Sequence, residues 1–332
     1  MAYQEEIYEA IKNNDDAKME ELLNRWLRSC INKKLKIQTE QYMGVMSALC
    51  LAVIEGDPVD TTIIQLLLKN GANPQKRRDW RIPSILPTLT EFLSPMSMAI
   101  KEQNISVLKL LLEAGASANE TSPGLKVQEE EGGSMLYRDT QETCLHRAVL
   151  MKNPAMVELL ITKGADVNAL NRDDQTPLHC CGHRYHPQVF RYLLCGGAMA
   201  SNVDQEGQSV LGLLLKPQQC DDGVEVWTSS EIQDRIESVH LLLSAGYHLQ
   251  RDVHVRNVVG ETTLNQNING ICQDKLFMVF INNRLANPPS LDFLCCIAIR
   301  QFLRYNCHLS VVDSLPLPQK LKDYILLKTY WK

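Results

Sequence analysis

Apolar residues recur along the chain at a helical spacing, in runs that end in glycine. In the run from 107 to 112, positions 107, 108, 111 and 112 are apolar, so they fall on one side of a helix. A glycine directly after such a run is typical of a helix that ends with a positive backbone φ angle. The pattern therefore predicts a series of amphipathic helices. The glycines that close them are Gly71, Gly115, Gly164, Gly197 and Gly246.

A shorter apolar segment that starts at a Ser or Thr precedes each of these runs. In the copies that start at Ser94, Thr143 and Thr176, the closing glycine follows 21 residues after the start. The step from Thr143 to Thr176 is 33 residues, and the same step leads to Ser209. A Ser or Thr at this place can cap a helix, and a proline directly after it, as in Pro177, fits the first turn.

The period of 33 residues and the segment Thr176-Pro177-Leu178-His179 resemble the ankyrin repeat, whose signature is T-P-L-H-x-A. Weaker copies start at Ser47 and Ser209, and residues 7–23 are similar to a degenerate first copy. We count about six repeats across residues 3–250. Because a single repeat cannot bury its own apolar face, the copies must stack on one another.

Three insertions interrupt the period. Residues 74–92 and 119–141 fall in the finger connections between successive repeats, where repeat arrays commonly bind partners. We expect both fingers to project from the same side of the stack. Residues 217–232 separate the two helices of one repeat, so the second helix is expected only at 238–246.

The two fingers differ in charge. The first carries Lys76, Arg77, Arg78 and Arg81 around Trp80, and this cluster could hold an acidic or phosphorylated partner. A solvated loop is the alternative, and we favour it there. We also favour it for Glu129–Glu131 in the second finger.

The period is lost after Gln250. An amphipathic segment at 271–285 is expected to close the stack, and Pro288-Pro289 then stops it. A new helix starts at Ser290. Its apolar positions form one continuous stripe, and they are Leu291, Leu294, Cys295, Ala298, Ile299 and Phe302.

This stripe resembles the elongin-binding box, a small residue followed by L-x-x-x-C-x-x-x-aliphatic. The segment Leu315-Pro316-Leu317-Pro318 is similar to the cullin box in the form associated with cullin-5. Together they make 288–332 similar to a SOCS box, and the chain resembles the ankyrin-repeat and SOCS-box (ASB) family. One departure is Cys296, at a place where the family often has Arg.

The resemblance implies partners and a role for each motif. Elongin B, elongin C, cullin-5 and a RING protein would bind the SOCS box, and the repeats would bind an unidentified protein substrate. The resemblance places elongin on Leu291, Leu294, Cys295 and Ile299, and the cullin on Leu315, Pro316, Leu317 and Pro318. Lys76, Arg77, Arg78, Trp80 and Arg81 are the candidates for substrate binding.

The predicted fold is all-α, an ankyrin solenoid of about six repeats followed by a small three-helix SOCS box. The expected domains are residues 1–250, a capping or connecting segment at 251–287, and the SOCS box at 288–332. The implied function is that of a non-catalytic substrate receptor of a ubiquitin ligase. The alternative is an ankyrin scaffold whose C-terminal helices only cap the solenoid.

Composition narrows the classes further. Apolar residues make up 45% of the chain and charged residues 22%, which argues against a disordered protein. A net charge of −5 gives no reason to expect nucleic acid, and we expect no membrane partner because no apolar run approaches about 20 residues. We expect no secretory signal at Met1–Glu6. The chain has eleven cysteines and no C-x-x-C pair. Without a secretory signal, these cysteines are expected to be free thiols in a reducing compartment, the cytoplasm, with the nucleus as the alternative.

One cluster has the composition of a zinc site, His179-Cys180-Cys181-Gly182-His183 with His186 close behind. The repeat register explains most of it, because His179 is the signature histidine and Cys181 falls on a buried small-residue position. No phosphate-binding loop, nucleophile elbow or H-E-x-x-H motif occurs. We therefore predict no metal, no cofactor and no catalytic residue.

Overall fold

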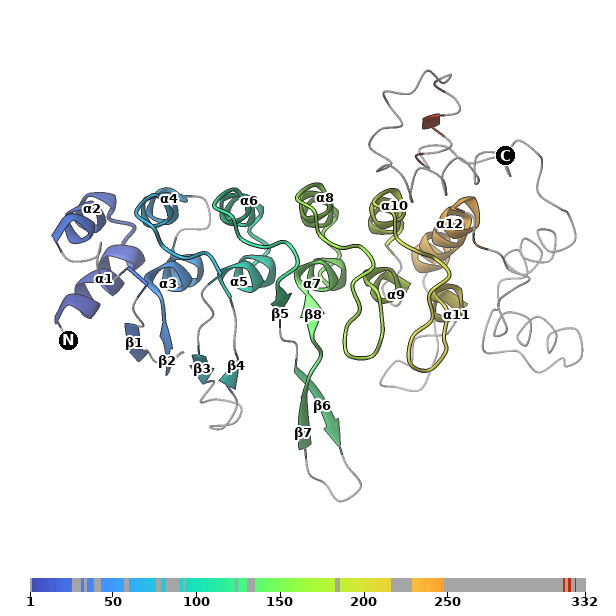
Figure 1. The fold of residues 1–332 in the computed structure, drawn as a ribbon, viewed down its shortest axis with the longest axis horizontal. Coiled ribbons are helices and arrows are strands. Elements are labelled where there is room, and N and C mark those ends of the chain that lie inside the picture. Colours follow the sequence, from blue (N-terminus) through green and yellow to red (C-terminus); the bar gives the residue numbers. More distant parts are fainter. Residues whose placement is uncertain are drawn as a thin grey trace, which may run out of the picture. The chain divides into compact units, whose positions relative to one another are not determined.

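A computed structural model gives the structure of the chain (Figure 1). It describes residues 2–25, 31–32, 35–38, 43–56, 60–75, 79–81, 90–91, 94–122, 125–129, 135–182, 186–215, 229–245, 247, 319, 322–323 and 326. The chain divides into two compact units, residues 1–166 and 167–332.

The described residues form helices that come in consecutive pairs, with short strands between some of the pairs. The helices are α1 (Ala2–Lys12), α2 (Asp16–Arg25), α3 (Ala48–Glu55), α4 (Thr62–Lys69), α5 (Pro95–Lys101), α6 (Ile105–Glu113), α7 (Cys144–Leu150), α8 (Pro154–Thr162), α9 (Pro177–Gly182), α10 (Pro187–Cys195), α11 (Val210–Leu215) and α12 (Ser229–Ser244). The strands are β1 (Leu35–Gln38), β2 (Met43–Met46), β3 (Asp79–Arg81), β4 (Thr90–Glu91), β5 (Thr121–Ser122), β6 (Leu125–Glu129), β7 (Met135–Asp139) and β8 (Glu142–Thr143).

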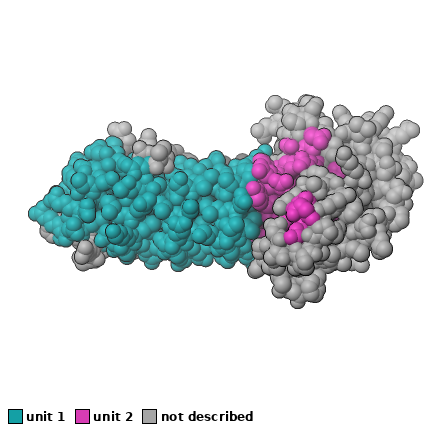
Figure 2. All heavy atoms as spheres, turned by 90° about the horizontal axis from the view of Figure 1, so that it is seen from above, with its two compact units in different colours: residues 1–166 teal, residues 167–332 magenta. Residues whose placement is uncertain are grey.

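In the first unit the helix pairs stack in two layers, as an ankyrin solenoid does. The first helices of the pairs pack in the series α1, α3, α5 and α7, and among the second helices α2 packs on α4 and α6 on α8 (Figure 1). The described atoms of this unit form one continuous elongated body (Figure 2). The second unit repeats the arrangement, since α9 packs on α11 and α10 on α12. The predicted ankyrin solenoid is confirmed.

The first helices inside the first unit, α3 and α5, are buried on almost every side, because each lies between two neighbouring first helices and its own partner. In α5 the residues from Pro95 to Ile100 are all buried. Such a helix has no polar face to hold it in place, so its start is fixed by a cap. Ser94 Oγ accepts a hydrogen bond from Ser97 N at 3.1 Å, and Ser47 Oγ accepts one from Cys50 N at 3.3 Å.

The second helices are amphipathic, as the sequence predicts. In α6 the four apolar positions Val107, Leu108, Leu111 and Leu112 are buried, and Lys109 between them is exposed. Gly71, Gly115, Gly164 and Gly197 end their helices with φ of 90°, 90°, 86° and 99°. This confirms why glycine stands there, since a residue with a Cβ is strained at such angles.

The last helix pair departs from the expectation. Helix α12 begins at Ser229, so part of the predicted insertion at 217–232 is helical. The extension brings Arg235 to the C-terminal end of α11, where its Nε donates to Leu214 O at 2.7 Å and its Nη2 donates to the same oxygen. The last carbonyls of a helix have no partner within it, so a buried guanidinium here satisfies one of them.

Candidate functional site

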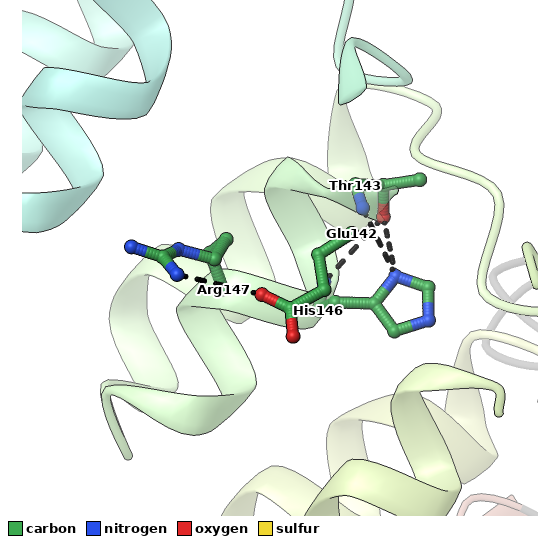
Figure 3. Close-up of polar contacts among 4 residues, drawn as sticks. All are labelled: Glu142, Thr143, His146 and Arg147. Carbon is green, nitrogen blue, oxygen red and sulfur yellow. Dashed lines mark hydrogen bonds and ion pairs between the residues drawn. The ribbon is translucent and has the colours of Figure 1, made fainter. Parts of the chain in front are cut away.

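A capping box fixes the base of the second finger. Thr143 ends β8 and caps α7, and its backbone N–H donates to Nδ1 of His146 at 3.2 Å. His146 N donates in turn to Thr143 Oγ1 at 3.4 Å, and Oγ1 lies 2.8 Å from Nδ1 (Figure 3). Because Nδ1 accepts from a backbone N–H, the ring proton lies on Nε2. The imidazole is fully buried, so this arrangement is rigid.

The residues on either side of the cap strengthen the same base. Glu142 precedes Thr143 and is buried, and its carboxylate lies 3.4 Å from the guanidinium of Arg147 one turn along α7 (Figure 3). Thr121 and Thr143 pair across β5 and β8, and Cys144 N donates to Glu120 O at 3.0 Å. Both ends of the finger therefore start from one hydrogen-bonded base.

Above this base the finger is a β-hairpin. Strands β6 and β7 pair over five positions, from Leu125 with Asp139 to Glu129 with Met135. We expected Glu129–Glu131 to be a solvated loop, and this is wrong for Glu129, which ends β6. Glu130 and Glu131 lie outside the described residues. The alternation of Leu125, Lys126, Val127 and Gln128 in β6, with Gly132-Gly133 before the next apolar run, is the signal that could have predicted the hairpin.

The first finger joins the preceding connection in a sheet. Strands β1 to β4 form four antiparallel strands in sequential order, and the β2–β3 pair links two successive repeats. Figure 1 shows this sheet and the β6–β7 hairpin on the same side of the helix layers of the first unit, as predicted. A sheet holds the fingers in a defined geometry, which isolated loops would not do.

The register places Trp80 near the middle of this sheet. Trp80 pairs with Gly44 on one side and with Glu91 on the other, and Ile37 pairs with Gly44 beyond it. By this register Ile37, Gly44, Trp80 and Glu91 form one row of paired positions across the four strands. A glycine inside a strand is often found where another chain or ligand approaches closely.

The structure describes only part of the predicted site set. Trp80 and Arg81 lie in β3, so the loop that we favoured there is wrong for these two. Lys76, Arg77 and Arg78 lie outside the described residues, as do all the residues predicted to bind elongin and the cullin, which are Leu291, Leu294, Cys295, Ile299, Leu315, Pro316, Leu317 and Pro318.

In the second unit the fingers are tight turns. Asn171 Oδ1 accepts from Asp173 N and Gln175 N, both at 2.9 Å, and Asp204 does the same for the residues two and four positions on. Gln175 Nε2 donates to Asp204 Oδ2 at 3.3 Å, which ties the two turns together. Leu170 and Val203 stand at equivalent places, and each is 54% exposed.

In the zinc-like cluster His179, Cys181 and His186 make hydrogen bonds within the fold, and His183 lies outside the described residues. Thr176 N donates to Nδ1 of His179 at 3.2 Å, and Nε2 of the same ring lies 3.1 Å from Asn202 O. Cys181 Sγ donates to His186 O at 3.7 Å, and His186 caps α10. Within the part of the chain that the structure describes, no group of three or more His, Cys, Asp and Glu is placed to hold a metal ion.

A cleft of about 300 Å³ lies beside the N-terminal end of α10. Its lining residues are His186, Pro187, Gln188, Arg191, Asp234 and Glu237. Basic and acidic side chains face it together, so its charge selects no class of ligand. None of the described helices is long and apolar enough to cross a membrane.

Models of two known protein families match the chain, one in the repeats and one in the C-terminal region. The family model for ankyrin repeats (3 copies) matches residues 88–171 and 145–252, and the model for the SOCS box matches residues 287–326. The chain belongs to the ankyrin-repeat and SOCS-box family.

Relatives of this ankyrin-repeat and SOCS-box protein are longer than the chain itself. Ankyrin repeat and SOCS box protein 14 of Homo sapiens is 29% identical over 250 residues, 71% of this chain and 37% of that protein. Its counterpart from Mus musculus is 28% identical over 281 residues, 80% of this chain and 42% of the other. A Bos taurus protein named dynein axonemal heavy chain 12 is 29% identical over 251 residues, 71% of this chain and 61% of its own length. The chain thus spans less than two thirds of these relatives.

Proposed function

We propose that this protein is the substrate-recognition subunit of a ubiquitin ligase built on elongin B, elongin C, cullin-5 and a RING protein. The observation that carries the proposal is that a SOCS-box match follows an ankyrin array in one chain. The SOCS-box match at 287–326 spans both the elongin-like motif that begins at Ser290 and the cullin-like motif at Leu315–Pro318. An ankyrin array precedes it, and such arrays bind other proteins.

In this role the chain supplies proximity and no chemistry. The array holds the substrate, the SOCS box holds the ligase core, and the acceptor lysine is thereby kept near the ubiquitin carrier. Leu291, Leu294, Cys295 and Ile299 form the apolar stripe for an elongin C groove, a common mode of helix recognition. Leu315–Pro318 is a separate motif, for the cullin. We place this assembly in the cytoplasm, with the nucleus as the alternative.

The fingers of the first unit are our candidate substrate surface. Trp80 pairs with Gly44 across β2 and β3, Arg81 follows it in β3, and Lys76–Arg78 precede the strand in the sequence. Aromatic residues flanked by arginine are frequent hot spots of protein interfaces, which supports this choice. The substrate that suits such a surface is a protein with an acidic or phosphorylated segment.

The elongin contact is tested by co-purification with elongin C. Leu291→Asp places a charge in the apolar stripe and should abolish binding, since such an anchor is typically worth about 2 kcal/mol or more. Leu170→Asp is the matched control, because it makes the same change at a leucine that is 54% exposed in the repeats. Undiminished elongin C binding by Leu291→Asp would overturn the assignment and favour the ankyrin scaffold.

The cullin element is tested apart from elongin. Replacing Leu315, Pro316, Leu317 and Pro318 with alanine should remove cullin-5 and retain elongin B and C. Loss of both together would show that the C-terminal region acts as one structural unit. For the substrate, Trp80→Ala should weaken capture of a verified substrate while elongin and cullin assembly stays intact, and unaltered capture would place recognition elsewhere on the repeats.

A further inference from the structure

The second helices share an outer position two residues before the closing glycine. Lys69, Glu113 and Thr162 occupy it in α4, α6 and α8, and all three are exposed. In α10 the same position holds Cys195, which is half-buried. Cysteine is small and weakly polar, and here it is partly covered, whereas its three counterparts are polar and exposed. This difference indicates that another segment lies against the end of α10.

The two glycines that follow α10, Gly196 and Gly197, are also more covered than most of their counterparts. Gly196 is half-buried, whereas Ala114 and Lys163 at the matching places are exposed and Asn70 is half-buried with a longer side chain. Its φ of −71° and ψ of −5° are ordinary helical values, so the backbone conformation does not require glycine. Gly197 does require glycine at its φ of 99°, but it too is half-buried where Gly164 is exposed. Glycine at 196 is instead suited to the close approach of another segment.

The segment that makes contact belongs to the chain's own C-terminal region. Cys195 Sγ donates a hydrogen bond to Leu326 O at 3.0 Å. Leu326 N donates to Lys322 O at 2.9 Å, and Gln319 Nε2 donates to Asp323 Oδ1 at 2.8 Å, so 319–326 includes a helical turn. Lys322, Asp323 and Leu326 are all half-buried.

We propose that the outer end of α10, formed by Cys195, Gly196 and Gly197, is a docking site for the helical turn at 319–326. The missing side chain at Gly196 lets the turn come close, and the thiol donates to a carbonyl at its end. Long polar side chains, such as Lys69 and Lys163 at the matching places, would hold the same turn off. The docking is a property of this chain alone and does not depend on the proposed ligase role.

If the protein is a ligase subunit as proposed, the docking also affects how the cullin is held. This consequence rests on the proposed function. Leu326 follows the cullin-like motif Leu315–Pro318 by eight residues. Anchoring the segment just after this motif to a repeat would limit how far a bound cullin can swing relative to the helices of the second unit. The proposed ligase role would stand without the docking, because elongin binding is tested through Leu291.

One experiment leaves the docked region unaltered and compares two thiols by alkylation with iodoacetamide, followed by peptide mass spectrometry. Thr162→Cys creates an exposed thiol at the position of α8 that matches Cys195 in α10. We expect Cys195 to react at least about tenfold more slowly, because the turn must first open. Equal rates at the two positions would overturn the docking.

A second experiment removes the docking and follows amide exchange of residues 319–326 in the full chain. Cys195→Lys and Gly196→Lys install the residues found at the matching positions in α4 and α8, and Thr162→Lys makes a matched change on α8. We expect exchange in 319–326 to rise about tenfold in the first two and to stay unchanged in the third. Unchanged exchange in all three would contradict the proposal, and the melting temperature checks that each variant is folded.

Discussion

The repeats that start at Thr143 and Thr176 can be compared with those that start at Ser47, Ser94 and Ser209. All five start a helix in the same way, with a side-chain oxygen that accepts from the backbone N–H three residues on. In the two Thr copies a histidine at that third position returns a bond, because its Nδ1 accepts from the backbone N–H of the Thr. The Ser copies have Cys50, Ser97 and Gly212 there.

The difference shows what the signature histidine adds to a helix start. A Ser cap satisfies one N–H of the helix, whereas the Thr–His pair also satisfies the N–H of the cap residue itself. The imidazole rings of His146 and His179 are fully buried, so they fill space in the core as well. Repeats with the histidine should therefore be the stable centre of the array, and those without it should depend more on their neighbours.

The largest expected effect is that of removing one histidine. His146→Ala leaves the buried N–H of Thr143 without an acceptor and opens a cavity, at a cost of about 2–4 kcal/mol. Ser97→Ala is the matched change in α5, where the side chain is also buried but small, and it should cost about 1 kcal/mol or less. Denaturant unfolding measures both, and equal costs would show that the capping box does not separate the two kinds of repeat.

Amide exchange should show the same ranking along the chain. We expect the slowest exchange in 143–198 and faster exchange toward both ends, by about tenfold or more in rate. The inserted segments 119–141 and 217–228 should be fastest, the second range being shortened because α12 begins at Ser229, and in the first of these β6 and β7 pair only with each other within the described strands. Two strands alone are marginally stable in water. Even protection across all repeats would contradict the comparison.

A smaller effect concerns the bonds between successive repeats. Asn119 Nδ2 donates to Gly164 O at 3.3 Å, and its Oδ1 accepts from Asp166 N at 2.6 Å, so one side chain ties two glycine turns together. Asn73 lies two residues after its closing glycine, whereas Asn119 lies four after its own, and Asn73 Oδ1 accepts from Gln75 N within its own turn at 2.9 Å. Asn119→Ala should cost about 1 kcal/mol and Asn73→Ala about half of that. If thermal unfolding gives the same shift for both, the bond between repeats adds no stability.

Sequence alone predicted the parts of this fold that repeat and missed those that do not. The caps, the buried first helices and the glycine turns follow from local rules at a fixed period, so Ser94 and Gly115 could be placed without a structure. The strand pairing of Trp80 with Gly44 could not, because it joins the first finger to the connection that precedes α3. The start of α12 was missed for a related reason, since Arg235 is explained by its acceptor on α11 and not by its own neighbours in sequence.

The smallest effect is a pH-dependent one at the N-terminal end of the array. Hydrogen bonds from the side chain and backbone of Thr62, and from Asn14, lower the pKa of Asp60 below its ordinary value of 3.8. Burial and the charges of Asp60 and Asp15 raise the pKa of Asp16. Asp60 therefore adds stability above pH 3.8 that is lost as the pH falls through its lowered pKa, and Asp16 has the opposite sign.

Two variants separate these contributions. Asp60→Asn should destabilise the protein slightly at pH 7, and the difference from the native chain should shrink in acid, where the native carboxylate is protonated as well. Asp16→Asn should be neutral to slightly stabilising at pH 7. It removes a carboxylate whose ionised form is disfavoured by burial and by repulsion from Asp60. Glu113→Gln, on the exposed side of α6, controls for the change in net charge. Melting curves at both pH values check the result, and a constant Asp60→Asn difference would show that these bonds do not favour the ionised form.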